Sequence, residues 1–147
     1  MSYRVLMVCT GNICRSVMAE EILREAVERR GLDVVVDSAG ISDEEHGHGI
    51  DSRAARALRE GGYRVPSHRA RQVEAGELQR WDLILAMTSS HLRALERLAG
   101  GPDPKIRMFR EFEVSGGEVS HRRDLDVPDP WYGDYSDFEA TRETIEN

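Results

Sequence analysis

The pattern of apolar and polar positions alternates between short apolar runs and longer stretches with helical spacing. An apolar run at residues 4–8 has the length and character of a buried strand. A polar loop follows, and apolar residues then recur at helical spacing over residues 17–30, up to Gly31. Further strands are predicted at residues 34–36, 81–87 and 105–109, and further helices at residues 52–60, at residues 88–98 with Thr88 as N-cap, and from Ser136, which forms a capping box with Glu139.

Strands that alternate with helices predict an α/β fold, a three-layer α/β/α sandwich with a central four-stranded parallel sheet. The chain has 147 residues without an internal repeat, a low-complexity tract or a linker, so we expect residues 1–147 to form a single domain. Ligands of such sheets bind beyond the carboxyl ends of the strands. Two loops leave predicted strands there, one at Cys9 and the other at residues 37–40, with the sequence DSAG.

Composition and charge exclude several classes of protein. The net charge of −7 argues against nucleic acid as a partner. No apolar run approaches the roughly 20 residues of a membrane-spanning helix, and the first residues do not resemble a signal peptide, so we expect a cytoplasmic protein without a membrane partner. The two cysteines, Cys9 and Cys14, are too few for a disulfide scaffold, and their spacing does not fit a zinc half-site.

The strongest chemical signal is the loop CTGNICRS at residues 9–16, which follows the first predicted strand and precedes the first predicted helix. A strand-loop-helix turn points successive backbone N–H groups into one hollow, which suits phosphate, and the helix N-terminus adds positive potential. Arg15 can bind two phosphate oxygens at once. Positive surroundings of this kind favour the thiolate form of a cysteine, so Cys9 is a candidate nucleophile.

Other residues of the loop fit the same interpretation. Gly11 permits close backbone approach, Asn12 tolerates left-handed backbone angles, and Ser16 can donate a hydrogen bond to the sulfur of Cys9. The loop lacks the Gly-Lys-Ser/Thr of nucleotide-binding phosphate loops. The alternative interpretation is a free structural cysteine at a strand end, because a Cys-x5-Arg spacing alone is common.

A phenol with a pKa near 10 leaves poorly as phenolate, so an aryl phosphatase needs a general acid. Asp129 is the best candidate, because it lies between two prolines that stiffen its backbone. Trp131 and Tyr132 follow and can line a cleft for an aromatic substrate. We interpret the neighbouring Asp124, Asp126 and Asp134 as parts of an acidic surface loop.

Four motifs resemble the low-molecular-weight protein tyrosine phosphatases along nearly the whole chain. They are VCTGNICRS at residues 8–16, DSAG at residues 37–40, SHRARQ at residues 67–72 and DPWYGD at residues 129–134. The resemblance implies phosphotyrosine-containing proteins as substrates, no metal and no cofactor, and we expect a monomer.

The resemblance also implies a role for each matched residue. Cys9 would be the nucleophile that becomes phosphocysteine, Arg15 the phosphate clamp, and Asp129 the acid and then the base for water. Cys14 matches a cysteine that can form a disulfide with Cys9 under oxidation. The phosphate-binding loop is Thr10, Gly11, Asn12, Ile13, Cys14 and Ser16; the aromatic cleft residues are Trp131 and Tyr132; the supporting hydrogen-bond network adds Ser38 and His68.

The sequence departs from the family pattern at three places. Glu44 stands where an aromatic cleft residue is usual, and an acid near a phosphate dianion is unfavourable. We therefore expect weaker binding of simple aryl phosphates and a preference for basic residues beside the phosphotyrosine. Thr88 stands where many members have Asp, and we interpret Thr88 as a helix cap. The chain also ends at Asn147, two or three turns earlier than is usual.

Four other functions stay open at this point. Arsenate reductases of the same fold need further cysteines, and none follows Cys14. Protein arginine phosphatases of the same fold typically carry Thr where this chain has Ile13. A phosphate-binding module without catalysis is the third alternative. The fourth is a metal site at Glu44, Glu45, His46 and His48. We prefer to interpret this polar stretch as a solvated loop.

Overall fold

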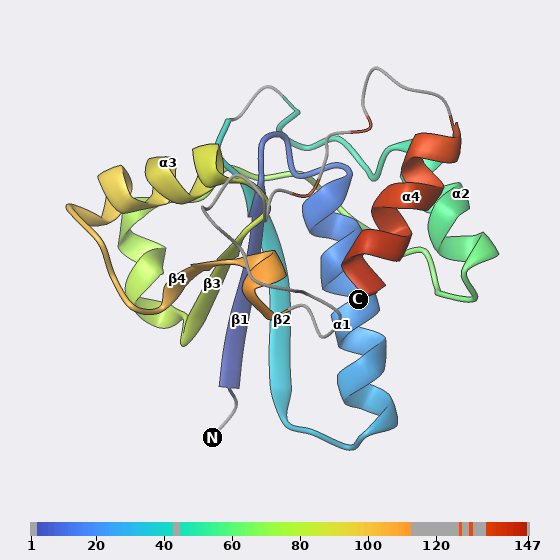
Figure 1. Ribbon diagram of the computed structural model, residues 1–147, viewed down its shortest axis with the longest axis horizontal. Coiled ribbons are helices and arrows are strands. Elements are labelled where there is room, and N and C mark those ends of the chain that lie inside the picture. Colours follow the sequence, from blue (N-terminus) through green and yellow to red (C-terminus); the bar gives the residue numbers. More distant parts are fainter. Residues whose placement is uncertain (1–2, 43–44, 113–126, 128–129, 131–134, 147) are drawn as a thin grey trace.

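The computed structural model describes residues 3–42, 45–112, 127, 130 and 135–146. Four strands form one parallel sheet in the order β2-β1-β3-β4 (Figure 1). The elements along the chain are β1 (Tyr3–Cys9), α1 (Arg15–Arg29), β2 (Val34–Gly40), α2 (Ser52–Glu60), the 3-10 helix η1 (Ala75–Arg80), β3 (Leu83–Ala86), α3 (Ser89–Ala99), β4 (Ile106–Met108), the 3-10 helix η2 (Phe109–Phe112) and α4 (Tyr135–Glu146).

The side chains of the central strand β1 alternate between two apolar cores. Val5 and Met7 join the core under α1, α2 and α4, while Leu6 and Val8 join the core under α3 and η1. Figure 1 shows these two groups of helices on opposite sides of the sheet. The predicted three-layer architecture with a four-stranded parallel sheet is therefore confirmed.

The strand register places the candidate chemistry at one edge of the sheet. Cys9 pairs with Gly40 of β2, and Val8 pairs with Ala86 of β3. The loop after β1, the end of β2 and the start of α3 therefore meet at the carboxyl ends of the strands, where parallel sheets bind their ligands.

Element boundaries differ from the predicted ones by a few residues. Strand β2 runs on to Gly40, because the DSAG segment pairs with β1 over its whole length. Helix α1 begins at Arg15, so the arginine of the loop is its first residue. Helix α4 begins at Tyr135, so Ser136 lies in its first turn and is not its N-cap. The short helix η1 was not predicted.

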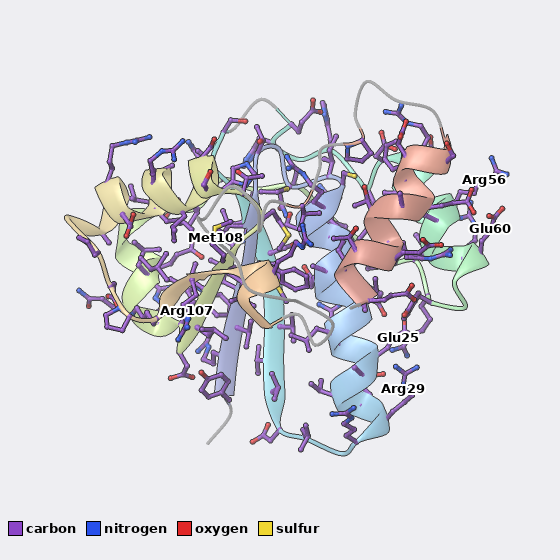
Figure 2. All side chains as sticks on the ribbon, viewed as in Figure 1. Glu25, Arg29, Arg56, Glu60, Arg107 and Met108 are labelled. Carbon is purple, nitrogen blue, oxygen red and sulfur yellow. The ribbon has the colours of Figure 1, made fainter. Side chains whose placement is uncertain are left out.

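Two helices begin at side-chain caps. Asp51 accepts hydrogen bonds from the N–H groups of Arg53 and Ala54 at the start of α2. Thr88 accepts one from the N–H of His91 at the start of α3, so its interpretation as a helix cap is confirmed. Figure 2 shows Arg56 and Glu60 on α2, where they form an exposed ion pair. Within the described residues, no helix combines the length and the apolar character that a membrane span requires.

Candidate active site

The loop between β1 and α1 is buried at Asn12, Ile13 and Cys14, while Thr10 is exposed. Cys9 is the last residue of β1 and Arg15 the first of α1, and both side chains are almost fully buried. Ser16 lies in the first turn of α1, with its Oγ 3.0 Å from the Sγ of Cys9. The thiol and a hydroxyl that can donate to it are therefore neighbours, as the sequence predicted.

The carbonyl groups of this loop point outward. The carbonyl oxygens of Cys9 and Thr10 accept hydrogen bonds from the N–H groups of Ile41 and Ser42. Those of Asn12, Ile13 and Cys14 accept from the His68 ring, from the N–H of Asp51 and from the N–H of Met18, respectively.

This arrangement has a direct consequence for the loop N–H groups. Because a peptide unit holds its N–H opposite its C=O, outward carbonyls turn the N–H groups toward the hollow of the loop. Converging N–H groups at the start of a helix form an anion site. The loop therefore has the backbone geometry that phosphate binding requires.

Asn12 is the centre of a buried hydrogen-bond network beneath the loop. It is the only described non-glycine residue with positive φ, at 60°, a left-handed conformation that asparagine tolerates better than most residues. Its Nδ2 donates to the Oγ of Ser16 and to the Oγ of Ser38, each at 2.9 Å. Its Oδ1 accepts from the backbone N–H of Arg71 at 3.1 Å. The predicted supporting residue Ser38 thus contacts the loop directly.

His68 supports the same residue from its backbone side. Its Nε2 lies 2.6 Å from the carbonyl oxygen of Asn12. A carbonyl can only accept, so Nε2 carries the hydrogen and the tautomer is fixed at that nitrogen. His68 belongs to residues 67–72, which also provide the N–H of Arg71, so this motif acts as a brace for the loop.

Arg71 is itself fixed by two acids. Its guanidinium donates to Glu77 at 2.8 Å and to Asp37 at 3.2 Å. Burial opposes its charge, but these two partners hold the pKa of Arg71 above its ordinary value. Burial likewise opposes the charge of Glu77, and the hydrogen bond from Arg71 outweighs it, so the pKa of Glu77 is lowered. This charged pair holds the brace in place.

Gly40 lies directly under the loop. A Cβ at this position would stand 2.6 Å from the carbonyl oxygen of Thr10 and within 3.2 Å of backbone atoms of Gly11 and Asn12. Backbone atoms cannot rotate away, so only glycine fits here. The final glycine of the DSAG motif is therefore a packing requirement of the loop.

On the opposite side of the loop, a side-chain hydrogen bond joins Thr10 to α3. The Oγ1 of Thr10 and the Nε2 of His91 share a hydrogen bond of 2.8 Å. His91 is buried in the first turn of α3, where Thr88 caps the helix. The cap hydrogen bond is made to the backbone N–H of His91.

Arg15 contacts a residue that is distant in sequence. Its Nη1 donates to the carbonyl oxygen of Val127 at 3.0 Å, and the N–H of Val127 donates to Met87 at the end of β3, at 2.7 Å. Val127 is completely buried. Residue 127, two positions before the candidate acid Asp129, therefore lies against the phosphate loop.

Glu45 is an acidic residue at the rim of the loop. The Glu45 side chain lies against Gly11, where an added Cβ would stand 3.1 Å from its Cγ, and it pairs with His48 at 2.6 Å. Within the described part of the chain, no group of His, Cys, Asp and Glu could hold a metal ion. Cys9 and Cys14 are both buried, and neither forms a disulfide.

The structure thus brings together most of the candidate residues: Cys9, Thr10, Gly11, Asn12, Ile13, Cys14, Arg15, Ser16, Ser38 and His68. Glu44, Asp129, Trp131 and Tyr132 lie outside the described residues. Sequence reasoning did not single out Glu20, Gly40, Arg71 or His91, which the geometry ties to the loop. Only Gly40 and Arg71 gave a signal, as members of recognised motifs.

Comparison with known proteins agrees with this geometry. Residues 4–147 match the family model described as low molecular weight phosphotyrosine protein phosphatase. A low molecular weight protein-tyrosine-phosphatase of Streptomyces coelicolor is 45% identical, over 99% of this chain and 88% of its own length.

Solved structures give the same result. A protein tyrosine phosphatase of Entamoeba histolytica superposes with a TM-score of 0.87 at 29% identity, over 99% of this chain and 90% of that one. The arginine phosphatase YwlE of Bacillus subtilis superposes with a TM-score of 0.82 at 30% identity, over 97% of this chain and 88% of that one. With its buried Cys9 and Arg15 on an inward-facing loop of backbone N–H groups, this chain is a phosphatase that belongs to the low molecular weight phosphotyrosine protein phosphatase family.

Proposed function

We propose that this phosphatase hydrolyses phosphotyrosine in proteins through a phosphocysteine on Cys9. In the first step the Cys9 thiolate attacks phosphorus and forms the S–P bond, while the bond from phosphorus to the phenolic oxygen breaks. Asp129 gives its proton to that oxygen, so tyrosine leaves as a neutral phenol. Arg15 and the loop N–H groups bind the three equatorial oxygens.

The second step returns the enzyme to its starting state. Asp129, now a carboxylate, takes a proton from water, and the water oxygen attacks phosphorus. The S–P bond breaks and the electron pair returns to Cys9 as thiolate, with inorganic phosphate as the product. A hydrogen bond from Ser16 stabilises the leaving thiolate. No metal or cofactor takes part in either step.

The observation that supports this proposal most directly is the outward orientation of the loop carbonyls, with the Cys9 sulfur at the base of the same loop. The N–H groups that this orientation turns inward are donors that need no rearrangement when charge develops on the phosphoryl oxygens. The YwlE structure supports a covalent route, because it is a cysteine-to-serine variant with a phosphorylated active-site serine.

Asp129 is supported as the acid by its place in the sequence. It follows Val127 by two positions, and Val127 accepts a hydrogen bond from Arg15. A general acid must come within hydrogen-bond reach of the leaving oxygen in the substrate complex.

Protein arginine phosphatase activity is the second candidate, because YwlE is among the structural relatives. Ile13 favours tyrosine, since arginine phosphatases of this fold typically carry Thr at the matching position. Parallel assays on a phosphotyrosine peptide and a phosphoarginine peptide of the same sequence separate the two. We expect turnover of the phosphotyrosine peptide; preferential turnover of phosphoarginine would overturn the assignment.

The surroundings of the site suggest the kind of substrate. We propose phosphoproteins with basic residues beside the phosphotyrosine, because Glu44 is acidic and the chain carries a net charge of −7. Two cysteines outside any disulfide fit a reducing compartment, so we propose a cytoplasmic enzyme, which we expect to act as a monomer. A Glu44→Trp variant with unchanged kinetics on basic and acidic phosphopeptides would contradict the proposed preference.

The central test is turnover of p-nitrophenyl phosphate in the presence of EDTA. We expect full activity of the wild type, none for Cys9→Ser, and a fall in kcat of about 10²–10⁴-fold for Asp129→Ala. Part of this loss should persist on substrates whose leaving group needs no proton, because Asp129 also takes the proton from water in the second step. Activity that survives in Cys9→Ser would overturn the proposed function.

A further inference from the structure

The network beneath the loop continues past Ser38 to a buried acid. The Oγ of Ser38 lies 2.5 Å from the Oε1 of Glu20, which is only 5% exposed on α1. The other oxygen of Glu20 accepts from Arg24. A continuous chain of side-chain hydrogen bonds therefore runs from Arg24 through Glu20, Ser38, Asn12 and Ser16 to Cys9.

The outer end of this chain sets the direction of each hydrogen bond. A carboxylate has no hydrogen to donate, so the Ser38 hydroxyl must donate to Glu20. The Ser38 oxygen then turns its lone pairs toward Asn12, whose Nδ2 is a donor. Ser38 is thereby locked as an acceptor for Asn12 and as a donor to Glu20.

A second anchor fixes Asn12 from the other side. The backbone N–H of Arg71 donates to Oδ1, which orients the amide so that Nδ2 faces both serines. The oxygen of Ser16 accepts one of the Nδ2 hydrogens, so its own hydrogen is available for the sulfur 3.0 Å away. This series of hydrogen bonds thus ends with the hydroxyl hydrogen of Ser16 directed at the sulfur of Cys9.

On this basis, and resting on the proposed phosphocysteine mechanism, we propose that Glu20, held by Arg24, is a positioning residue of the reaction. By accepting the hydrogen of Ser38 it orients the series Ser38-Asn12-Ser16, so that Ser16 donates to the Cys9 thiolate. Glu20 does not touch the substrate, and its effect reaches the sulfur only through the series.

Arg24 is well placed for this role. It donates to Glu20, to Oε1 of Glu21 at 2.9 Å and to the carbonyl oxygen of Val36 at 3.2 Å. Burial opposes its charge, but the attraction of Glu20, followed by that of Glu21, holds the pKa of Arg24 above its ordinary value. A permanently charged donor keeps the Glu20 carboxylate turned toward Ser38.

The chain offers a matched control in the adjacent residue. Glu21 lies on the same helix, is as buried as Glu20 and binds the same arginine, but it has no hydrogen bond to Ser38 or Asn12. A general effect of losing a buried acid from α1 should appear in both variants. An effect that travels through Ser38 should appear only when Glu20 is changed.

The first experiment compares Glu20→Gln with Glu21→Gln. Because Arg24 can only donate, the new glutamine keeps its oxygen toward Arg24 and turns its NH₂ toward Ser38, which loses its acceptor. We expect kcat on p-nitrophenyl phosphate to fall about 10-fold in Glu20→Gln, as expected for one lost charged hydrogen bond, with KM within about 2-fold. Glu21→Gln should keep the wild-type kcat.

The second measurement follows the sulfur without turnover. The rate of Cys9 alkylation by iodoacetamide is recorded against pH, with Cys14→Ala as the common background. Loss of the Ser16 hydrogen bond destabilises the thiolate, so the midpoint of this profile should move upward by about one pH unit in Glu20→Gln. It should not move in Glu21→Gln. Because this readout needs no substrate, it tests the positioning role even if the proposed reaction is wrong.

A double-mutant cycle with Ser38→Ala completes the test. If Glu20 acts through Ser38, the double variant should be no slower than Ser38→Ala alone. Ser38→Ala also replaces Glu20→Gln as the test variant if the latter fails to fold. Equal kinetics and equal alkylation profiles for Glu20→Gln and Glu21→Gln, or additive losses in the cycle, would overturn the proposal.

Discussion

The phosphate loop is held in different ways on its two flanks. The β2 flank consists of Asn12, Ser16, Ser38 and Glu20, joined by buried side-chain hydrogen bonds in series. The α3 flank consists of Thr10 and His91, joined by a side-chain hydrogen bond of 2.8 Å. The two flanks face the same hollow. Among the described residues, the β2 flank holds the loop by a series of side-chain hydrogen bonds, and the α3 flank holds it by the hydrogen bond between Thr10 and His91.

The difference follows from where the backbone leaves regular structure. Thr10 comes directly after β1, and Cys9 is still paired with Gly40 in the sheet, so the ladder fixes the start of the loop. Asn12 adopts a left-handed conformation that is unfavourable for most residues, with an energetic cost on the order of 1–2 kcal/mol. Such a conformation persists only where its surroundings determine it, and the β2 flank supplies those surroundings.

The largest effect should come from closing the space under the loop with Gly40→Ala. The new Cβ would meet the carbonyl oxygen of Thr10 at 2.6 Å, so the whole loop must move. We expect kcat/KM to fall about 100-fold, as for a displacement of about 1 Å at a catalytic site. Overpacking should lower the free energy of unfolding by about 1–3 kcal/mol, measured by urea titration.

Gly76→Ala is the control for this variant. No atom lies within 4 Å of an added Cβ at Gly76, and its φ is not positive, so both activity and stability should stay near wild type. An active Gly40→Ala enzyme would mean that the loop tolerates displacement and that the β2 flank is less rigid than its contacts indicate.

Removing the centre of the network should have the next largest effect. The Asn12→Ala variant leaves Ser38 and the N–H of Arg71 without this partner. If the activation free energy rises by about 2 kcal/mol because the loop is less well oriented, kcat should fall roughly 30-fold. Asn12→Gly separates the two functions of this residue, because glycine accepts a φ of 60° but has no side chain. It should recover part of the stability and none of the activity. Recovery of activity in Asn12→Gly would mean that only the backbone conformation matters.

The α3 flank should respond more weakly. Thr10→Val keeps the shape of the side chain and removes one hydrogen bond worth about 1 kcal/mol, so we expect a fall in kcat/KM of about 5-fold. Thr88→Ala removes the helix cap and should lower the free energy of unfolding by about 1 kcal/mol with little change in kinetics. A loss in Thr10→Val larger than that in Asn12→Ala would reverse the ranking of the two flanks.

The same comparison explains what the sequence could predict. The loop, its position after β1 and the tolerance of Asn12 for left-handed angles were predictable, because each depends on a local pattern or on one residue type. Glu20 and His91 were not, because their partners lie 18 and 81 residues away in the sequence. A helical pattern assigns Glu20 to a solvated face, whereas the first turns of α1 are buried on all sides by β2 and the neighbouring helices.

The boundaries follow the same rule. The apolar pattern of β2 ends at Val36, but pairing with β1 extends the strand through polar Ser38 to Gly40, a tertiary effect that overrides local preference. The start of α4 was misplaced at Ser136, because a capping-box pattern also arises inside a first helical turn.

The smallest effect on activity should come from the acid beside Glu20. Burial, followed by a hydrogen bond with Glu25, raises the pKa of Glu21 from 4.5 to about 7. Figure 2 shows Glu25 on α1, one turn beyond Glu21. A carboxyl whose pKa is higher in the folded than in the unfolded state holds its proton more tightly when folded. Its contribution to the free energy of unfolding is therefore complete below about pH 4.5 and declines as the pH rises toward about 7.

Glu21→Gln should remove this dependence, because glutamine stays neutral at every pH. The free energy of unfolding, measured by urea titration, should be compared between Glu21→Gln and wild type at pH 5 and at pH 8. The difference, variant minus wild type, should be more positive at pH 8 than at pH 5. Glu60→Gln, which removes an exposed ion pair with Arg56, should change stability little at either pH. Throughout this range kcat should match wild type, because Glu21 has no hydrogen bond to the series that ends at Cys9. A shift of the pH profile of kcat in Glu21→Gln would mean that Glu21 also acts on Cys9. The β2 flank would then include Glu21, and the comparison of the two flanks would have to be made again with this residue.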